Sequence, residues 1–183
     1  MKLKLKNVRL AFPVLFEARA QNSGDKPAFS AAFLFPPDHE AHKLVNDAID
    51  QVAKEKWGAK ADVTLKTIRA ADKICLHNGD TKANLAGYEG NLFINARSAT
   101  RPGVFDADGS ALTQYDGKPY AGCYVHAIID LYCQDNSYGK RVNASLAGVM
   151  FAKDGEAFSG GGAASADDFG DLVSDLTAAD LVG

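Results

Sequence analysis

The stretch KLKLKNVRLAF, residues 2–12, alternates polar with apolar side chains and changes phase once, at Asn7. Leu3 and Leu5 share one parity, whereas the apolar residues after Asn7 have the other, so a regular strand would place them on opposite faces. One extra residue at Asn7, a β-bulge, restores a single apolar face made of Leu3, Leu5, Val8, Leu10 and Phe12. The stretch therefore predicts a long bulged strand with one face in the core.

The opposite face of this strand would carry a basic stripe, formed by Lys2, Lys4, Lys6 and Arg9. Such a stripe can contact the backbone of a nucleic acid. Lysines on an edge strand can equally protect a sheet from aggregation. The sequence leaves both interpretations open.

A second strand and one helix follow. AFSAAFLF (28–35) alternates in the same way, and the polar turn at 22–27 predicts a hairpin with the first strand. Pro36 and Pro37 end this strand. Asp38 is then the expected N-cap of a helix over residues 39–57, which Gly58 would end.

The rest of the chain up to residue 151 has the pattern of strands separated by turns. The expected strands cover residues 62–68, 73–76, 91–98, 120–133 and 140–151. Many short strands with a single helix are typical of a mainly β fold, here an antiparallel sheet that closes into a small barrel.

Length and composition indicate one domain with an appendage. The 183 residues are 46% hydrophobic, which is enough to fill one core. We expect a domain over residues 1–158 and a flexible acidic tail over residues 159–183, joined by the glycines at 160–162. Three cysteines without CxxC spacing, and the absence of a long apolar run, predict a cytoplasmic protein without membrane spans.

Charge separates these two parts. All 20 Lys and Arg lie before residue 159, whereas the tail holds five of the 23 acidic residues. Eighteen acids therefore remain in residues 1–158, which carry a formal charge of +2. A basic body with an acidic arm is typical of a protein that binds polyanions.

The search for catalytic or metal-binding groups finds little. HEAH (39–42) spaces its histidines by three residues, whereas the zinc-protease helix spaces them by four. The strongest metal hypothesis is a set split between strand faces: Cys75, His77, Cys123, His126 and Cys133. DADGS (106–110) indicates a turn rather than a calcium loop. We therefore expect no catalytic centre, metal or cofactor.

Aromatic and basic side chains recur where strand parity directs them outward. NLFINARS (91–98) would expose Phe93 and Arg97, and the strand at 120–133 would expose Tyr124 and Tyr132. Rings of this kind can stack on bases, while cations contact phosphates. The predicted phosphate-binding set comprises Arg97 together with Lys66, Arg101, Lys140 and Arg141.

The order and spacing of several segments resemble bacteriophage single-stranded-DNA-binding proteins. The resemblance lies in NVRLAFPVLFEARA (7–20), FSAAFLFPPDHE (29–40), GYEGNLFINARSATRPGVFD (87–106) and the segment at 120–158. It implies an OB-fold, a five-stranded Greek-key barrel, and single-stranded DNA as the partner. It also implies a role in phage DNA replication or recombination, in the host cytoplasm, without a catalytic centre.

The tail has two expected roles. Its acidic and aromatic residues could compete with DNA for the basic body or recruit replication proteins: Asp167, Asp168, Phe169, Asp171, Asp175 and Asp180. Several similar phage proteins end in an aromatic residue, whereas this chain ends in Leu181, Val182 and Gly183.

Other interpretations stay open. The barrel could be a protein–protein interaction module without a nucleic-acid role, or a metal-dependent hydrolase with dispersed Asp, His and Cys residues. RNA could replace DNA, because stacking accepts either sugar. The sequence does not define self-association or cooperativity.

Overall fold

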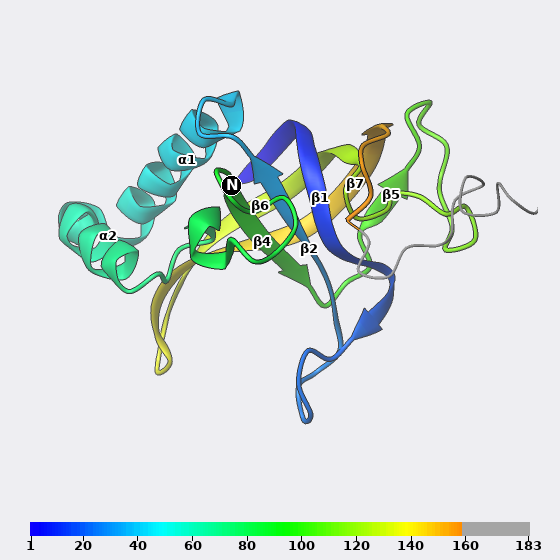
Figure 1. Cartoon of the computed structure of the whole chain (residues 1–183). Coiled ribbons are helices and arrows are strands. Elements are labelled where there is room, and N and C mark those ends of the chain that lie inside the picture. Colours follow the sequence, from blue (N-terminus) through cyan, green and yellow to red (C-terminus); the bar gives the residue numbers. More distant parts are fainter. Residues whose placement is uncertain (159–183) are drawn as a thin grey trace, which may run out of the picture.

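The structure is a computed structural model and describes residues 1–158, which form a mainly β fold with helices at one end (Figure 1). The strands are β1 (Lys2–Arg19), β2 (Ala28–Phe35), β3 (Leu76–Asn78), β4 (Leu92–Ser98), β5 (Gly103–Phe105), β6 (Tyr124–Asn136) and β7 (Gly139–Lys153). The helices are α1 (Glu40–Trp57) and α2 (Ala61–Ala70), with short 3₁₀ helices η1 (Gly58–Lys60) and η2 (Gly79–Lys82).

Two irregularities in β1 decide which of its side chains reach the core. The register with β6 shifts between Leu5 and Val8, and Asn7 has a positive φ of 51°, so the predicted bulge is confirmed. The register with β2 shifts again after Ala11, where Phe12 has a φ of 47°. This second bulge turns Phe12 outward, with 59% of its surface exposed, so its predicted place in the core is wrong.

Five strands close into a barrel. Antiparallel pairs join β4 to β2, β2 to β1, β1 to β6 and β6 to β7. One parallel contact, between Arg97 of β4 and Ser145 of β7, joins the two ends of this series. The closed five-stranded barrel confirms the predicted OB-fold.

β1 pairs with different neighbours along its length. The part that carries the lysines, from Lys2 to Leu5, pairs with β6, whereas the pairing with β2 begins at Arg9. Since Lys2 and Lys4 have a strand partner on one side only, both interpretations of the basic stripe, edge protection and nucleic-acid contact, stay open.

The helix α1 matches the predicted range, although its N-cap is His39, whose Nδ1 accepts from the N–H of Ala41, and not Asp38. The predicted strand at 62–68 is wrong, because these residues form α2. Its β-branched residues suggested a strand. The buried positions have the 3.6-residue period of a helix instead: Ala61, Thr64, Leu65 and Ile68. The expectation of a single helix is wrong as well.

The other strands differ from prediction mainly at their ends. The strand expected at 73–76 is shifted to residues 76–78, and the three-residue β5 was not predicted. The apolar parity of the strand at 120–133 is confirmed, because its inward residues are all buried: Cys123, Val125, Ala127, Ile129 and Leu131. In residues 1–158, neither helix is long and apolar enough to cross a membrane.

Two apolar clusters hold the fold together. The larger fills the barrel and continues beneath α1 and α2. The smaller lies outside the barrel wall and comprises Ala11, Ala32, Leu34, Tyr88 and Phe93. Because the second cluster covers the outer face of β4, Phe93 is only 2% exposed, and its predicted availability for stacking is wrong.

The segment between η2 and β4 covers Phe93. The ring of Tyr88 meets the Phe93 ring edge-on at 4.9 Å, and the His77 ring stacks on it at 5.0 Å. The N–H of Gly79 donates to the carbonyl of Asn91 at 2.7 Å, which closes the segment on itself. A Cβ at Gly79 would clash with the carbonyl oxygens of Tyr88 and Asn91, so this closure requires glycine.

Replacing Phe93 with alanine is expected to lower the free energy of unfolding by about 3–5 kcal/mol, because the change leaves a cavity under Tyr88. Urea denaturation followed by circular dichroism measures this loss. Tyr132→Ala is the matched control, since that ring is 49% exposed and its removal creates no buried cavity. Equal stability losses for the two variants would contradict the buried position of Phe93.

Candidate nucleic-acid interface

Alternation along β4 directs Asn95 and Arg97 outward, opposite to the buried Ile94 and Ala96. These two outward side chains line two hollows at once, one on each side of β4. The hollows therefore adjoin each other along the outer face of the barrel. The hairpins β1–β2 and β6–β7 extend from the barrel in the same direction in the view of Figure 1.

The first hollow has a volume of about 390 Å³ and lies over β1, β2 and β4. It is lined by Phe12, Gln21, Ser30, Ala31, Ala32, Lys82, Leu85, Tyr88, Asn95, Ala96 and Arg97. Arg97 Nη2 donates to the carbonyl of Lys26 at 3.0 Å, which ties the β1–β2 hairpin to β4. The second apolar cluster supplies part of the wall through Ala32 and Tyr88.

The second hollow has a volume of about 310 Å³ and lies between β4, the start of β7 and residues 73–77. It is lined by Lys73, Ile74, Cys75, His77, Asn95, Arg97, Tyr132, Arg141, Asn143 and Ala144. Asn143 Nδ2 donates to Gln134 Oε1 at 3.0 Å, which orients one amide at its edge. The second hollow thus joins residues that are up to 71 positions apart in the sequence.

The charged side chains that line the two hollows are all basic. Four cations line them, Lys73, Lys82, Arg97 and Arg141, and no carboxylate of residues 1–158 lines either one. A surface of this kind attracts a polyanion and gives it no like charge to repel. Asp72 lies next to the second hollow, where its carboxylate contacts His77 Nδ1 at 2.7 Å.

Exposed aromatic rings lie in or beside these hollows. Phe12, in the first, is 59% exposed and tilts against Tyr88 at a ring distance of 6.2 Å. Tyr132, in the second, is 49% exposed, and Tyr138 at the tip of the β6–β7 hairpin is 85% exposed. Rings of this kind have free faces on which planar ligands can stack.

Three of the eight residues predicted for DNA contact come together in the second hollow, namely Arg97, Tyr132 and Arg141. Lys140 is exposed on the far side of the β6–β7 hairpin, and Lys66 is exposed on α2. Lys66 was expected on a strand, so its predicted position rested on the wrong periodicity. Arg101 lies over the ring of Phe16, 5.8 Å from its centroid.

Tyr124 lies apart from the hollows. It is eight residues before Tyr132 on β6, about 26 Å along a strand that rises roughly 3.3 Å per residue. Cations flank its ring: the Arg9 guanidinium is 5.7 Å and the Lys153 ammonium 4.8 Å from the centroid. The parity prediction placed Tyr124 on the correct face but could not reveal that this part of the strand is elsewhere on the barrel.

Sequence reasoning missed Phe12, Lys73 and Lys82 as residues of the interface. Phe12 was assigned to the core, and only its positive φ, a property of the backbone, distinguishes it. The two lysines lie in short irregular segments that carry no periodic signal. Their positive charge was the one property in the sequence that could have indicated contact with a phosphate.

The metal hypothesis finds no support in the described part of the chain. Among residues 1–158, no three His, Cys, Asp or Glu side chains are placed to bind one ion. Burial raises the pKa of the Cys75 thiol to about 12. Burial also raises the pKa of the Cys123 thiol, and both shifts disfavour the thiolate that a metal requires.

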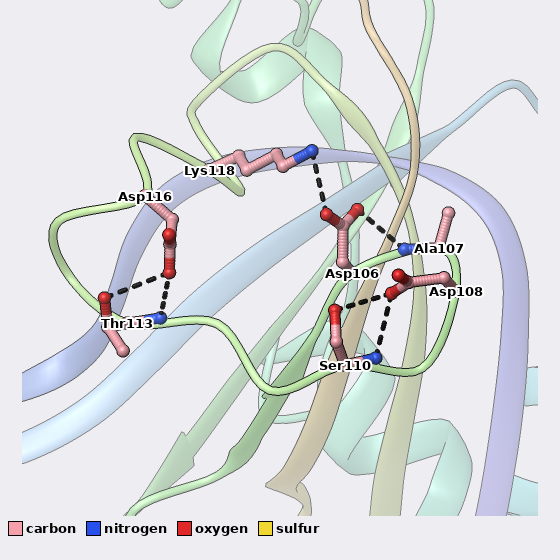
Figure 2. A network of polar contacts seen from close by, with 7 residues as sticks. All are labelled: Asp106, Ala107, Asp108, Ser110, Thr113, Asp116 and Lys118. Carbon is pink, nitrogen blue, oxygen red and sulfur yellow. Dashed lines mark hydrogen bonds and ion pairs between the residues drawn. The ribbon is translucent and has the colours of Figure 1, made fainter.

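The aspartates of residues 106–118 form turns (Figure 2). Asp108 accepts from the N–H and the hydroxyl of Ser110, at 2.9 and 2.6 Å, and Asp116 does the same with Thr113, at 2.6 and 3.0 Å. These hydrogen bonds lower the pKa of both carboxyls. The prediction that DADGS is a turn is confirmed.

Comparison with known proteins agrees with this geometry. A curated relative, protein p50 of Acyrthosiphon pisum secondary endosymbiont phage 1, is 43% identical over 175 residues, which cover 94% of each chain. The single-stranded DNA-binding protein of bacteriophage Enc34, solved in complex with single-stranded DNA, superposes with a TM-score of 0.75 at 29% identity. The match covers 86% of this chain and 89% of that one.

A more distant structure shows the same fold. The single-stranded DNA-binding protein gp2.5 of bacteriophage T7 has a TM-score of 0.55 at 14% identity, over 97% of this chain and 98% of that one. A family model described as the single-stranded-DNA-binding protein of Enterobacter phage Enc34 matches residues 1–181. The chain therefore belongs to the Enc34 family of phage single-stranded-DNA-binding proteins.

Proposed function

We propose that the chain binds single-stranded DNA along the two hollows that share Asn95 and Arg97. The observation that carries this proposal is the combination of four cations, no lining carboxylate and two half-exposed rings on one continuous face. Cations hold the phosphates, while Phe12 and Tyr132 stack on bases. Neither contact depends on base identity, so binding tolerates any sequence.

The position of this face in the barrel supports the proposal. β2 and β4 are the second and third strands of the five-stranded barrel, and oligonucleotides commonly bind there on OB-folds. The two loops that usually complete such sites correspond here to the β1–β2 and β6–β7 hairpins. The relative from phage Enc34 has been solved with single-stranded DNA bound.

In this function the chain coats exposed strands during phage DNA replication or recombination.

The basic stripe of β1 is not part of the proposed path. Lys4 and Lys6 line a different, mainly apolar hollow, with Phe105, His126, Ile128, Gly148, Val149 and Met150. This apolar hollow, of about 390 Å³, is the feature that would support the rival interaction module. For the rival hydrolase, no three His, Cys, Asp or Glu side chains of residues 1–158 are placed to bind one metal ion.

The cations of the two hollows predict a strong dependence on salt. The logarithm of the affinity for oligo-dT should fall linearly with the logarithm of the salt concentration, because each neutralised phosphate releases counterions. Arg97→Ala and Arg141→Ala should each reduce the slope by about 0.7. Fluorescence anisotropy with labelled oligo-dT measures this, with Lys43→Ala as the control outside the hollows. Undetectable binding at low salt, or tighter binding to duplex, would refute the proposal.

Two aromatic substitutions test stacking. Phe12→Ala and Tyr132→Ala should each weaken binding of oligo-dT by about 1–3 kcal/mol, because each removes a stacking surface while leaving the charge unchanged. Tyr115→Ala is the control, since this ring is 87% exposed and lines neither hollow. Stacking on Phe12 and Tyr132 would be refuted if Tyr115→Ala weakened binding of oligo-dT as much as Phe12→Ala and Tyr132→Ala, with all three variants equally folded.

The acidic tail supplies a separate prediction, although Asp167, Asp168, Phe169, Asp171, Asp175 and Asp180 lie outside the described residues. If the tail competes with DNA, replacing its five aspartates by asparagine should tighten binding to oligo-dT, most clearly at low salt. Unchanged or weaker binding would leave recruitment of replication proteins as its expected role. A titration of the full chain beside this variant decides between the two.

A further inference from the structure

A further hollow adjoins the proposed DNA path. It has a volume of about 310 Å³, lies against α2, and is lined by Val63, Thr64, Thr67, Ile68, Ala71, Lys73 and Lys140. We call it the α2 hollow. α2 belongs to a segment inserted between the barrel strands β2 and β4, and this segment contributes no strand to the five-stranded barrel.

Lys73 connects the α2 hollow to the second hollow, because its side chain lines both. It follows the end of α2, and its N–H donates to the carbonyl of Ile68 at 2.8 Å. Its ammonium reaches the β6–β7 hairpin, where it lies 3.8 Å from the position of a Cβ on Gly139. The surface from Arg141 past Lys73 to α2 is therefore continuous.

Cations on this side of the molecule are free of ion pairs. Among residues 1–158, no carboxylate lies within 4.0 Å of the ammonium groups of Lys66, Lys73 or Lys140. Asp62 precedes Lys66 by one helical turn, but the two are not paired. By contrast, Lys43 on α1 pairs with Asp47, and Arg69 at the end of α2 pairs with Asp50. Lys73 and Lys140, the two cations that line the α2 hollow, are therefore unpaired, whereas Lys66 is exposed elsewhere on α2 and does not line it.

Apolar and aromatic surface accompanies this charge. Val63 on α2 is 72% exposed, although it is a large apolar side chain and contributes nothing to the core. Tyr138, 85% exposed, lies at the hairpin tip two residues before Lys140. A nucleotide needs both kinds of contact, a cation for its phosphate and an apolar or aromatic surface for its base.

We propose that single-stranded DNA continues from the second hollow past Lys73 into the α2 hollow, where Lys140 holds an additional phosphate. This inference rests on the proposed function and lengthens its binding path. It gives the helical insertion a role in binding besides its role in the core. It also assigns a role in binding to Lys140, which lines neither barrel hollow.

Oligonucleotide length tests the proposal. Oligo-dT of increasing length, from about 4 to about 16 nucleotides, covers the usual range of OB-fold sites. The full chain is compared with the variant Lys140→Ala by fluorescence anisotropy over a range of salt concentrations. For the longest oligonucleotide, the variant should lose about 0.7 from the salt slope, since one phosphate contact is removed. For the shortest oligonucleotide that binds, affinity and slope should not change.

The matched control is Lys66→Ala, which removes an exposed cation of α2 that does not line the hollow and should leave binding of both oligonucleotides unaffected. An unchanged slope for the long oligonucleotide in the Lys140→Ala variant would overturn the extension. An equal loss for short and long oligonucleotides would overturn it too, because Lys140 would then act only through net charge. If the unaltered chain binds no oligonucleotide of any length, the proposed function itself fails.

Discussion

The parallel contact between β4 and β7 is the constraint on which the interface depends. It closes the barrel at Arg97 and Ser145, two residues that are separated in the sequence by β5, a long loop, β6 and the start of β7. Closure places the outward side chains of β4 beside those at the start of β7, so that Arg97 and Arg141 line one hollow. Without this contact the sheet would be open, and the two hollows would not share Asn95 and Arg97.

The outer wall of the barrel is partly covered, and this covering decides which rings are available. Phe93 and Asn95 have the same parity on β4, yet Phe93 is buried by Tyr88 and His77, while Asn95 is exposed. Phe12 presents the opposite case, since a bulge takes it out of the core and places it beside Tyr88. The segment between η2 and β4 therefore stabilises the barrel wall and also forms one side of the first hollow.

The position of the carboxylates, and not ion pairing, distinguishes the interface. Within residues 1–158, the Lys and Arg side chains in ion pairs are only Lys43, Arg69 and Lys118, so most cations are unpaired wherever they lie. What sets the two barrel hollows apart is that four cations and no carboxylate of residues 1–158 line them. A mildly basic body can thus present a strongly basic face, because several of its acidic side chains lie in turns and pairs outside the hollows.

The sequence by itself determined the periodic features: the bulge at Asn7, the helix α1, the inward face of the strand at 120–133 and the mainly β barrel. These follow from local alternation and turn residues, which act over a few positions. It could not distinguish α2 from a strand, because residues 62–68 are a short segment with four β-branched side chains, and their apolar pattern fits both periods. Tertiary structure alone decided that Phe93 is covered, that Phe12 is exposed and that Tyr124 lies away from Tyr132. These outcomes depend on contacts between segments distant in sequence and on barrel closure, which no local pattern encodes.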